Sequence, residues 1–133
     1  MITVQTTIQQ PIEIVWKKWT TPSDIMQWNN ASPDWHTPKA ENDLRAGGTF
    51  SFTMAAKDGS FSFDFGGTYT NVVEHFKIEY VLGDERRVMI DFSNHGDSVT
   101  ITETFDPENE NPLEMQQAGW QAILNNFKRY AEQ

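Results

Sequence analysis

The run from Asn111 to Tyr130 constrains the fold most, because no other part of the chain is long enough to form a central helix. On a 3.6-residue helical wheel, its apolar residues fall on one stripe and its polar residues on the opposite face. The stripe consists of Leu113, Trp120, Ile123, Leu124, Phe127 and Ala131. Asn111 is a suitable N-cap and Pro112 a suitable first helical residue. We therefore predict a long helix that begins at Pro112 and buries this stripe.

Gly119 is unusual inside this predicted helix, since a glycine there costs about 1 kcal/mol relative to alanine. It directly precedes Trp120, one of the large residues of the apolar stripe. We therefore expect the turn at Gly119 to lie close against another stretch of backbone.

The chain has 133 residues and no cysteine, which limits both its organisation and its chemistry. A chain of this length is expected to form one domain, residues 1–133, with a substantial hydrophobic core. The lack of cysteine excludes disulfides, thiolate metal sites and cysteine nucleophiles. No signal-peptide pattern opens the sequence, and no apolar run reaches the ~18 residues of a membrane span, so we expect a cytoplasmic protein.

The net charge of −9 makes two classes of partner unfavourable. Nucleic-acid binding needs a basic surface that displaces counterions from phosphates, and here lysine and arginine are scattered along the chain. An anionic membrane surface would repel the chain for the same reason. We therefore expect neither nucleic-acid nor membrane binding.

The hydrophobic pattern changes its period along the chain. Residues 1–9 alternate as a half-buried strand, and two short helices follow, beginning at Pro11 and Pro22. Residues 27–48 show no clean period, so we expect a long loop there. From Thr49 onward the period is two, which predicts about five or six antiparallel strands. These strands are expected near 49–54, 60–65, 68–73, 76–80, 88–92 and 99–105.

These elements together predict an α+β fold. An antiparallel sheet with one apolar face needs a second layer to cover that face. The C-terminal helix is the only predicted element long enough to supply it. We therefore expect a curved antiparallel sheet wrapped around a long C-terminal helix, with two short helices after the first strand.

A set of motifs follows in order along nearly the whole chain. They are Pro11-x3-Val15-Trp16-x3-Thr20, then Pro22 and Trp28, then Leu44-Arg45-x-Gly47-Gly48-x-Phe50, Gly67-x-Tyr69, a threonine-rich strand ending in Phe105, and Gly119-Trp120-x3-Leu124. In this order and spacing they resemble the START-like (SRPBCC) superfamily and, within it, the Hsp90-ATPase-activator-homologue (Aha1-type, AHSA1) family. The resemblance implies a helix-grip fold, in which a curved sheet wraps around the long C-terminal helix and commonly leaves a cavity.

The chain departs from the family pattern after the second predicted helix. Bacterial members often carry Trp-Trp-Gly-Pro there, whereas Trp28 is followed by Asn29-Asn30 in this sequence. That region shapes the mouth of the pocket in the family. The resemblance therefore does not carry a ligand type over to this chain.

The aromatic residues of the predicted strands indicate a binding cavity. Alternate strand positions would place most of them in the space between the sheet and the C-terminal helix. Aromatic walls with a few polar groups suit a small apolar ligand. The expected ligand-binding residues are Trp28, Trp35, Phe50, Phe52, Met54, Phe61, Phe63, Phe65, Tyr69, Phe76, Phe92, Glu103, Trp120 and Phe127. The alternative is a filled core without a cavity.

Glu103 interrupts an apolar strand face between Ile101 and Phe105. Such a carboxylate is more often found at a sheet edge or paired with an arginine, here Arg45 or Arg87. If it points inward without a partner, desolvation raises its pKa into a range suited to acid–base chemistry. The sequence leaves both arrangements open.

No metal site or catalytic set is recognisable in the sequence. His36, His75 and His95 fall in a predicted loop, strand and turn, without the spacing of metal ligands. There is no serine–histidine–aspartate arrangement and no phosphate-binding glycine loop. We therefore predict no metal, no cofactor and no catalytic residue.

Three functions compete on this basis. The first, which we favour, is non-catalytic binding of a small hydrophobic or aromatic molecule by a monomer or weak homodimer. The second, implied by the resemblance, is a stress-related or Hsp90-cochaperone-like interaction module, with an exposed apolar patch formed by Trp28 and Trp35. The third is a cyclase- or hydrolase-type enzyme, which would require Glu103 to lie inward beside the pocket.

Overall fold

The computed structural model describes residues 1–133 and contains seven strands and three helices. In chain order they are β1 (Ile2–Ile8), α1 (Ile12–Thr20), α2 (Pro22–Trp28), β2 (Trp35–Asn42), β3 (Thr49–Ala56), β4 (Ser62–Val73), β5 (Lys77–Leu82), β6 (Arg87–Asn94), β7 (Val99–Phe105) and α3 (Leu113–Ala131). All strands belong to one antiparallel sheet in the order β1-β7-β6-β5-β4-β3-β2. The predicted α+β fold is confirmed.

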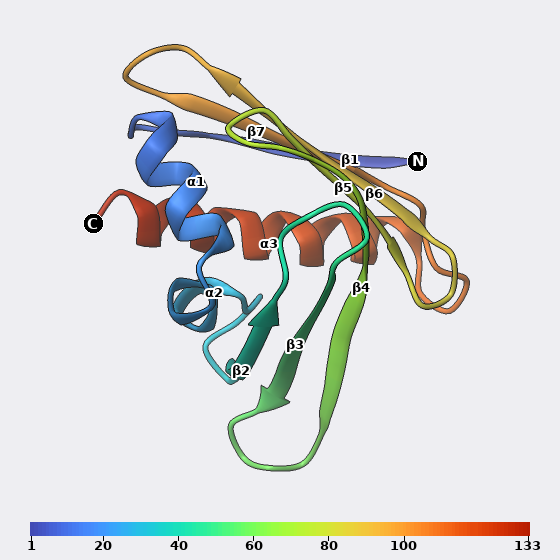
Figure 1. Ribbon diagram of the computed structural model, residues 1–133. Coiled ribbons are helices and arrows are strands. Elements are labelled where there is room, and N and C mark those ends of the chain that lie inside the picture. Colours follow the sequence, from blue (N-terminus) through green and yellow to red (C-terminus); the bar gives the residue numbers. More distant parts are fainter.

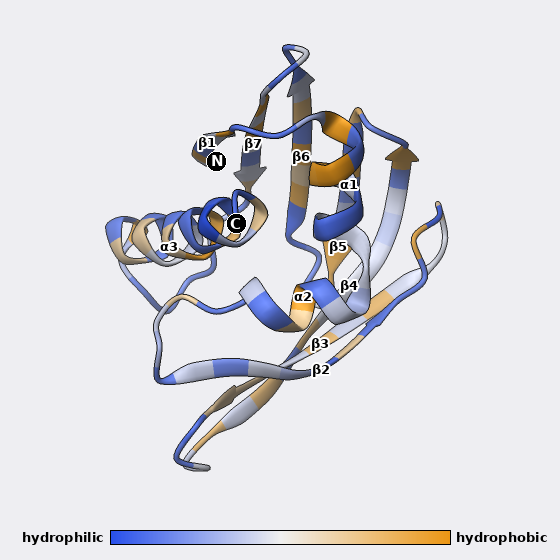
Figure 2. Cartoon of the chain, turned by 90° about the vertical axis from the view of Figure 1, so that its left-hand side faces the viewer, coloured by the Kyte–Doolittle hydropathy of each residue, from blue (hydrophilic) through white to orange (hydrophobic).

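The sheet is curved, and α3 lies inside the curve (Figures 1 and 2). Strands that follow one another in the chain are neighbours in the sheet, except that β1 pairs with β7 and not with β2. In β7 every second residue is buried, because alternate side chains of a strand point to the same face. Helix α3 packs along β1, and α2 packs along β2 at the opposite edge of the sheet. The curved sheet and the three helices therefore enclose one interior space.

The predicted loop at residues 27–48 is partly wrong, because β2 lies within it. This edge strand pairs with β3 and has a register irregularity between His36 and Lys39. Its sequence hides the strand period, since only one of its residues is buried and it includes Pro38. Proline is tolerated at sheet edges, where a strand needs fewer ladder hydrogen bonds.

The start of α3 also differs from the prediction. Pro112 is the N-cap, the helix begins at Leu113, and no side chain caps it. Leu113 is exposed, so it does not belong to the buried stripe. Trp120 and Ile123 are partly buried, and the fully buried part of the stripe lies in the second half of the helix, at Leu124, Phe127 and Ala131.

The core joins the inner face of the sheet to all three helices. Phe127 of α3 contacts the rings of Trp19 and Trp28, each at 4.9 Å between centroids. Further along α3, Trp120 stacks on Phe105 of β7, with ring centroids 3.9 Å apart and planes 13° from parallel. These aromatic contacts join α3 to α1, to α2 and to the sheet.

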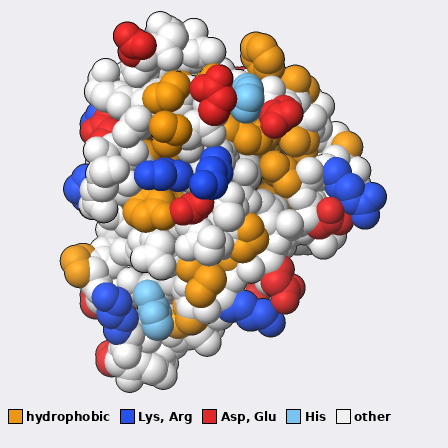
Figure 3. Space-filling model, turned by 60° about the vertical axis from the view of Figure 1, so that its left-hand side comes forward, with side chains coloured by type: hydrophobic (Ala, Val, Ile, Leu, Met, Phe, Trp, Pro, Cys, Tyr) orange, Lys and Arg blue, Asp and Glu red, His pale blue; other side chains and the backbone are white.

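The surface mixes both charge signs. On the face shown in Figure 3, acidic and basic side chains lie close together, and apolar atoms form several separate patches between them. None of the three helices is both long and apolar enough to cross a membrane.

Phe127→Ala should lower the free energy of unfolding by about 3–5 kcal/mol, because it removes a fully buried ring from a three-ring contact. Phe76→Ala is the matched control. Phe76 is 64% exposed, so its removal should change stability by less than about 0.5 kcal/mol. Urea unfolding of the two variants tests this, and equal losses would contradict the packing described here.

Candidate functional site

A cavity of about 320 Å³ lies between the sheet and α3. This volume is within the range of small-molecule sites in proteins. Of its 22 lining residues, 15 are hydrophobic. The lining consists of Trp19, Thr20, Trp28, Asn29, Ala31, Asn42, Phe50, Phe52, Met54, Phe63, Phe65, Tyr69, Ile78, Tyr80, Ile90, Glu103, Asn111, Met115, Gln116, Gly119, Trp120 and Ile123. The alternative of a filled core is therefore wrong.

Strand alternation and register place the aromatic wall of this cavity. On β3 and β4 the inward residues are paired across the ladder, so that Phe52 lies opposite Phe65 and Met54 opposite Phe63. Phe50 is opposite Gly67, where a side chain would collide with the carbonyl oxygen of Val81 at 2.5 Å. Glycine at this position therefore keeps β4 close to β5.

The rings of the wall contact one another. Phe50 lies at 5.1 Å from Phe52, 5.1 Å from Tyr69 and 4.7 Å from Tyr80, measured between ring centroids. Phe65 contacts both Tyr80 and Trp120 with its ring nearly perpendicular to theirs. Mutually packed rings have few alternative rotamers, so the wall is largely pre-formed for a ligand.

Glu103 is the only carboxylic acid in the lining. It lies on β7 in the interior of the sheet, between Val4 of β1 and Ile90 of β6, and is 5% exposed. Its carboxyl group has no hydrogen-bond or ion-pair partner in the chain, and burial raises its pKa from 4.5 to about 8. The carboxyl is therefore predominantly neutral at pH 7.

The expected pairing of Glu103 with an arginine is wrong. Arg45 binds Asp43 at 3.0 Å, and Arg87 binds Asp106 at 3.3 Å, both outside the cavity. Glu103 is also not at an edge, because β7 lies between two strands. Of the two arrangements left open by the sequence, the structure has the inward, unpaired carboxyl.

Asn29 supplies a second unpaired polar group. It follows α2, is 8% exposed, and its side-chain Nδ2 has no hydrogen-bond partner. Its backbone oxygen accepts a hydrogen bond from Thr37 Oγ1 at 2.6 Å, which holds the residue at the cavity. An unpaired buried amide donor is unfavourable by about 1–3 kcal/mol. The Nδ2 atom is itself buried rather than open to the cavity, so a ligand acceptor would reach it only if the side chain moved.

A chain of hydrogen bonds connects the cavity wall to α1. The Tyr69 hydroxyl donates to Asn42 Oδ1, and Asn42 Nδ2 donates to the backbone carbonyl oxygen of Thr20 at 2.8 Å. Burial raises the pKa of Tyr69 and of Tyr80 above the usual value for a phenol. Both phenols are therefore neutral across the physiological range of pH.

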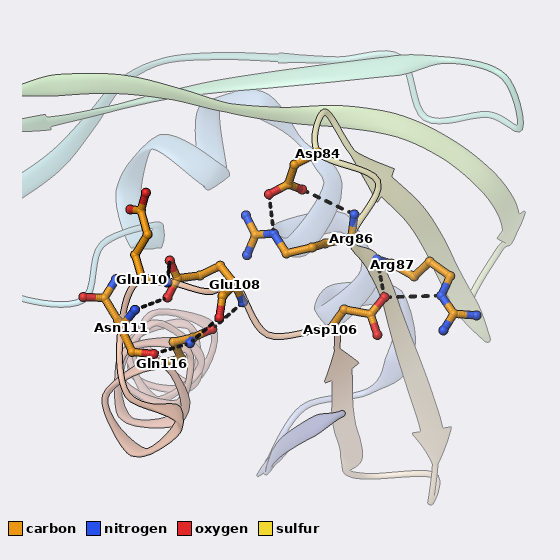
Figure 4. A network of polar contacts seen from close by, with 8 residues as sticks. All are labelled: Asp84, Arg86, Arg87, Asp106, Glu108, Glu110, Asn111 and Gln116. Atoms are coloured by element: carbon orange, nitrogen blue, oxygen red, sulfur yellow. Dashed lines mark hydrogen bonds and ion pairs between the residues drawn. The ribbon is translucent and has the colours of Figure 1, made fainter.

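The connector between β7 and α3 forms one end of the cavity and is held by its own polar network (Figure 4). Gln116 accepts from the Glu108 N–H at 2.9 Å and donates to the carbonyls of Glu108 and Asn111. The Asn111 N–H donates in turn to Glu108 Oε1 at 2.8 Å. Asn111, expected to cap the helix through its side chain, thus serves in this network instead.

The structure brings together most of the residues predicted to surround a ligand. Those that line the cavity are Trp28, Phe50, Phe52, Met54, Phe63, Phe65, Tyr69, Glu103 and Trp120. Their contact with a ligand stays a prediction. The sequence did not reveal Asn29, Asn42 and Gln116, because single polar residues at the ends of helices and strands carry no periodic signal.

Five predicted residues lie outside the cavity. Phe92 and Phe127 are buried in the core against α1 and α2. Phe76 is exposed because it lies in the turn between β4 and β5 rather than on a strand. Phe61 is 58% exposed and precedes β4 at the hairpin tip, where it contacts Trp35.

The expectation for Gly119 is also wrong. A Cβ built at this residue meets no atom within 4 Å, and the residue lines the cavity. Gly119 therefore faces open space inside the protein rather than another stretch of backbone.

The sequence of the chain is similar to that of a known protein family. The family model described as Activator of Hsp90 ATPase homolog 1-like protein matches residues 9–132. No curated protein matches the sequence.

Solved structures show the same fold. The solution structure of an AHSA1-like protein from Aeromonas hydrophila is 45% identical, with a TM-score of 0.90 over 98% of this chain and 92% of that one. A Cytophaga hutchinsonii protein is 60% identical, with a TM-score of 0.85 over 98% and 91%. A Chromobacterium violaceum protein, 23% identical with a TM-score of 0.83 over 99% and 97%, shows the fold alone.

Glu103→Gln should stabilise the protein more and more as the pH rises from 5 to 8. Between pH 4.5 and about 8 the folded protein holds a proton that the unfolded chain has lost. Because of Glu103, the free energy of unfolding therefore falls by about 1.4 kcal/mol for each unit by which the pH rises in this range. Glutamine does not titrate, so the unfolding free energy of the variant lacks this decrease. Urea unfolding of both proteins at pH 5, 6.5 and 8 tests the difference, and a constant difference would contradict it.

Proposed function

The chain belongs to the family of Activator of Hsp90 ATPase homolog 1-like proteins, and from its fold and cavity we propose that it binds a small, largely apolar aromatic molecule between the sheet and α3. The observation that carries this proposal is a cavity of about 320 Å³ with an aromatic wall and one unpaired carboxyl group, that of Glu103. This buried carboxyl group destabilises the protein. A ligand that pairs with it and fills the apolar space would offset that cost.

The lining favours binding without chemical change. It contains no serine, cysteine, histidine, lysine or aspartate, so neither a nucleophile with a base nor a pair of carboxyl groups is available. Thr20 is the only aliphatic hydroxyl, and it donates to the Trp16 carbonyl oxygen at 2.7 Å. Glu103 alone would have to perform any acid–base step, as the third hypothesis requires.

Filling the cavity should weaken binding strongly. The neutral dye N-phenyl-1-naphthylamine fluoresces more strongly in apolar surroundings, and it should bind the wild-type protein saturably. Gly119→Leu places a large side chain in the open space and should weaken dye binding at least tenfold, which corresponds to a loss of about 1.4 kcal/mol or more in binding free energy.

Gly119→Ala is the matched control for this variant. It removes the helix penalty of glycine and should raise the free energy of unfolding by up to about 1 kcal/mol, while most dye binding remains. Thermal unfolding of each variant establishes that it is folded. Absence of saturable binding to the wild type, or equal binding by the leucine variant, would refute the proposal.

A second candidate function is docking on a chaperone. Trp35, Phe61 and Phe63 form an apolar cluster at the β3–β4 tip, with ring centroids 6.0–6.2 Å apart. Phe61 is 58% and Phe63 43% exposed. Trp28, the other residue expected in an exposed patch, is only 4% exposed and belongs to the core.

If this cluster docks on Hsp90, the purified protein should increase the ATPase rate of that chaperone. A Phe61→Ser/Phe63→Ser double variant should then lose most of the increase, because it removes the exposed rings. Phe76→Ser, an exposed phenylalanine outside the cluster, should retain it. An unchanged ATPase rate with the wild-type protein would dismiss this candidate.

A further inference from the structure

The position of Glu103 bears on which ligand the cavity accepts. Its carboxyl group is the only acid in the lining and lies among apolar neighbours on three strands. A buried carboxylate is stable only when it is paired with a cation or with several hydrogen-bond donors. The chain supplies neither, so the ionised form of Glu103 requires a partner from outside.

The rest of the lining disfavours an anionic ligand. It contains no lysine, arginine or histidine, so an anionic ligand would find no counter-ion inside the cavity. Such a ligand would also approach the carboxyl group of Glu103 and a protein of net charge −9. Carboxylates and phosphates are therefore the least suitable ligands for this site.

The aromatic wall favours a cationic ligand. The faces of aromatic rings attract cations, and this attraction grows when water is excluded. Phe65, Tyr80 and Trp120 form a connected group of rings in the lining, and Tyr80 is close enough to Glu103 to feel its charge. Trp120 stacks on Phe105, two residues along β7 from Glu103 on the same inward face.

We propose that the ligand of this cavity is a hydrophobic amine, whose ammonium group pairs with the Glu103 carboxylate while its apolar body fills the aromatic space. This inference rests on the proposed function and adds the chemical class of the ligand.

Binding of the amine is coupled to one proton. At pH 7 the carboxyl group is protonated, so pairing with an ammonium ion releases its proton to solvent. The other titratable groups of the lining are Tyr69 and Tyr80, whose phenols stay neutral. The charge of Arg86 acts on the pKa of Tyr80, but Arg86 itself is paired with Asp84 at 2.7 Å. Neither β1, β6 nor α3 contributes another titratable group to the lining. Affinity should therefore rise about tenfold per pH unit from pH 6 towards pH 8.

Three naphthalenes of similar shape test the inference directly: 2-naphthylmethylamine, 2-naphthylmethanol and 2-naphthoate. Each is titrated calorimetrically into the wild-type protein at pH 6, 7 and 8. At pH 8 the amine should bind at least tenfold more tightly than the alcohol, and the margin should shrink towards pH 6. The naphthoate should bind most weakly. At pH 7, titrations in two buffers of different ionisation enthalpy should report about one proton released per amine bound.

Two glutamate variants separate the pairing from general effects of charge. Glu103→Gln should lose the preference for the amine over the alcohol and its pH dependence. Glu79→Gln is the matched control, because it removes the same charge from an ion pair with Lys77 outside the cavity. It should keep the preference.

The outcomes distinguish the two proposals. If the alcohol or the naphthoate binds the wild type as tightly as the amine, or if Glu103→Gln keeps the preference, the amine inference is overturned and the binding function stands. If neither these compounds nor N-phenyl-1-naphthylamine bind the folded protein, both proposals fail together.

Discussion

The contact between α3 and the curved sheet controls the rest of the structure. The inner face of the sheet is apolar, and α3 is the only helix long enough to cover it. Its second half fills the space completely, with Leu124, Phe127 and Ala131 fully buried. Its first half does not, because Gly119 has no side chain and Trp120 lies flat against Phe105. The cavity is the space that this uneven covering leaves open.

The lining of that space is not arranged for stability. Glu103 is a buried acid without a partner, and Asn29 has an unpaired donor. Each would be replaced at a gain in stability by a neutral or apolar residue of similar size. Protein sites that carry such costs are commonly functional, since interactions with a ligand compensate for them only when the ligand is bound. The proposed amine ligand would offset the cost of the buried Glu103 carboxyl group in this way.

The relatives share the fold of this chain. The proteins from Aeromonas hydrophila and Cytophaga hutchinsonii superimpose over nearly their whole length. One fold supports many activities, and the function is determined by the particular residues of the site. Here those residues include Asn29 and Glu103, which both line the cavity.

The sequence by itself determined the elements and the general fold. Period-two alternation located the strands that follow Thr49, and the apolar stripe located the C-terminal helix, because both patterns reflect local backbone geometry. It failed for β2, where an exposed edge strand with Pro38 lacks a periodic face.

Tertiary structure alone decided which inward residues surround open space. Phe127 and Trp120 belong to the same helical stripe, yet one is packed in the core and the other lines the cavity. The same holds for Glu103, whose missing partner is evident only when the places of Arg45 and Arg87 are known. The physical reason is that a cavity or an unpaired acid arises from how segments far apart in the sequence are placed. Local sequence patterns contain no information on that placement.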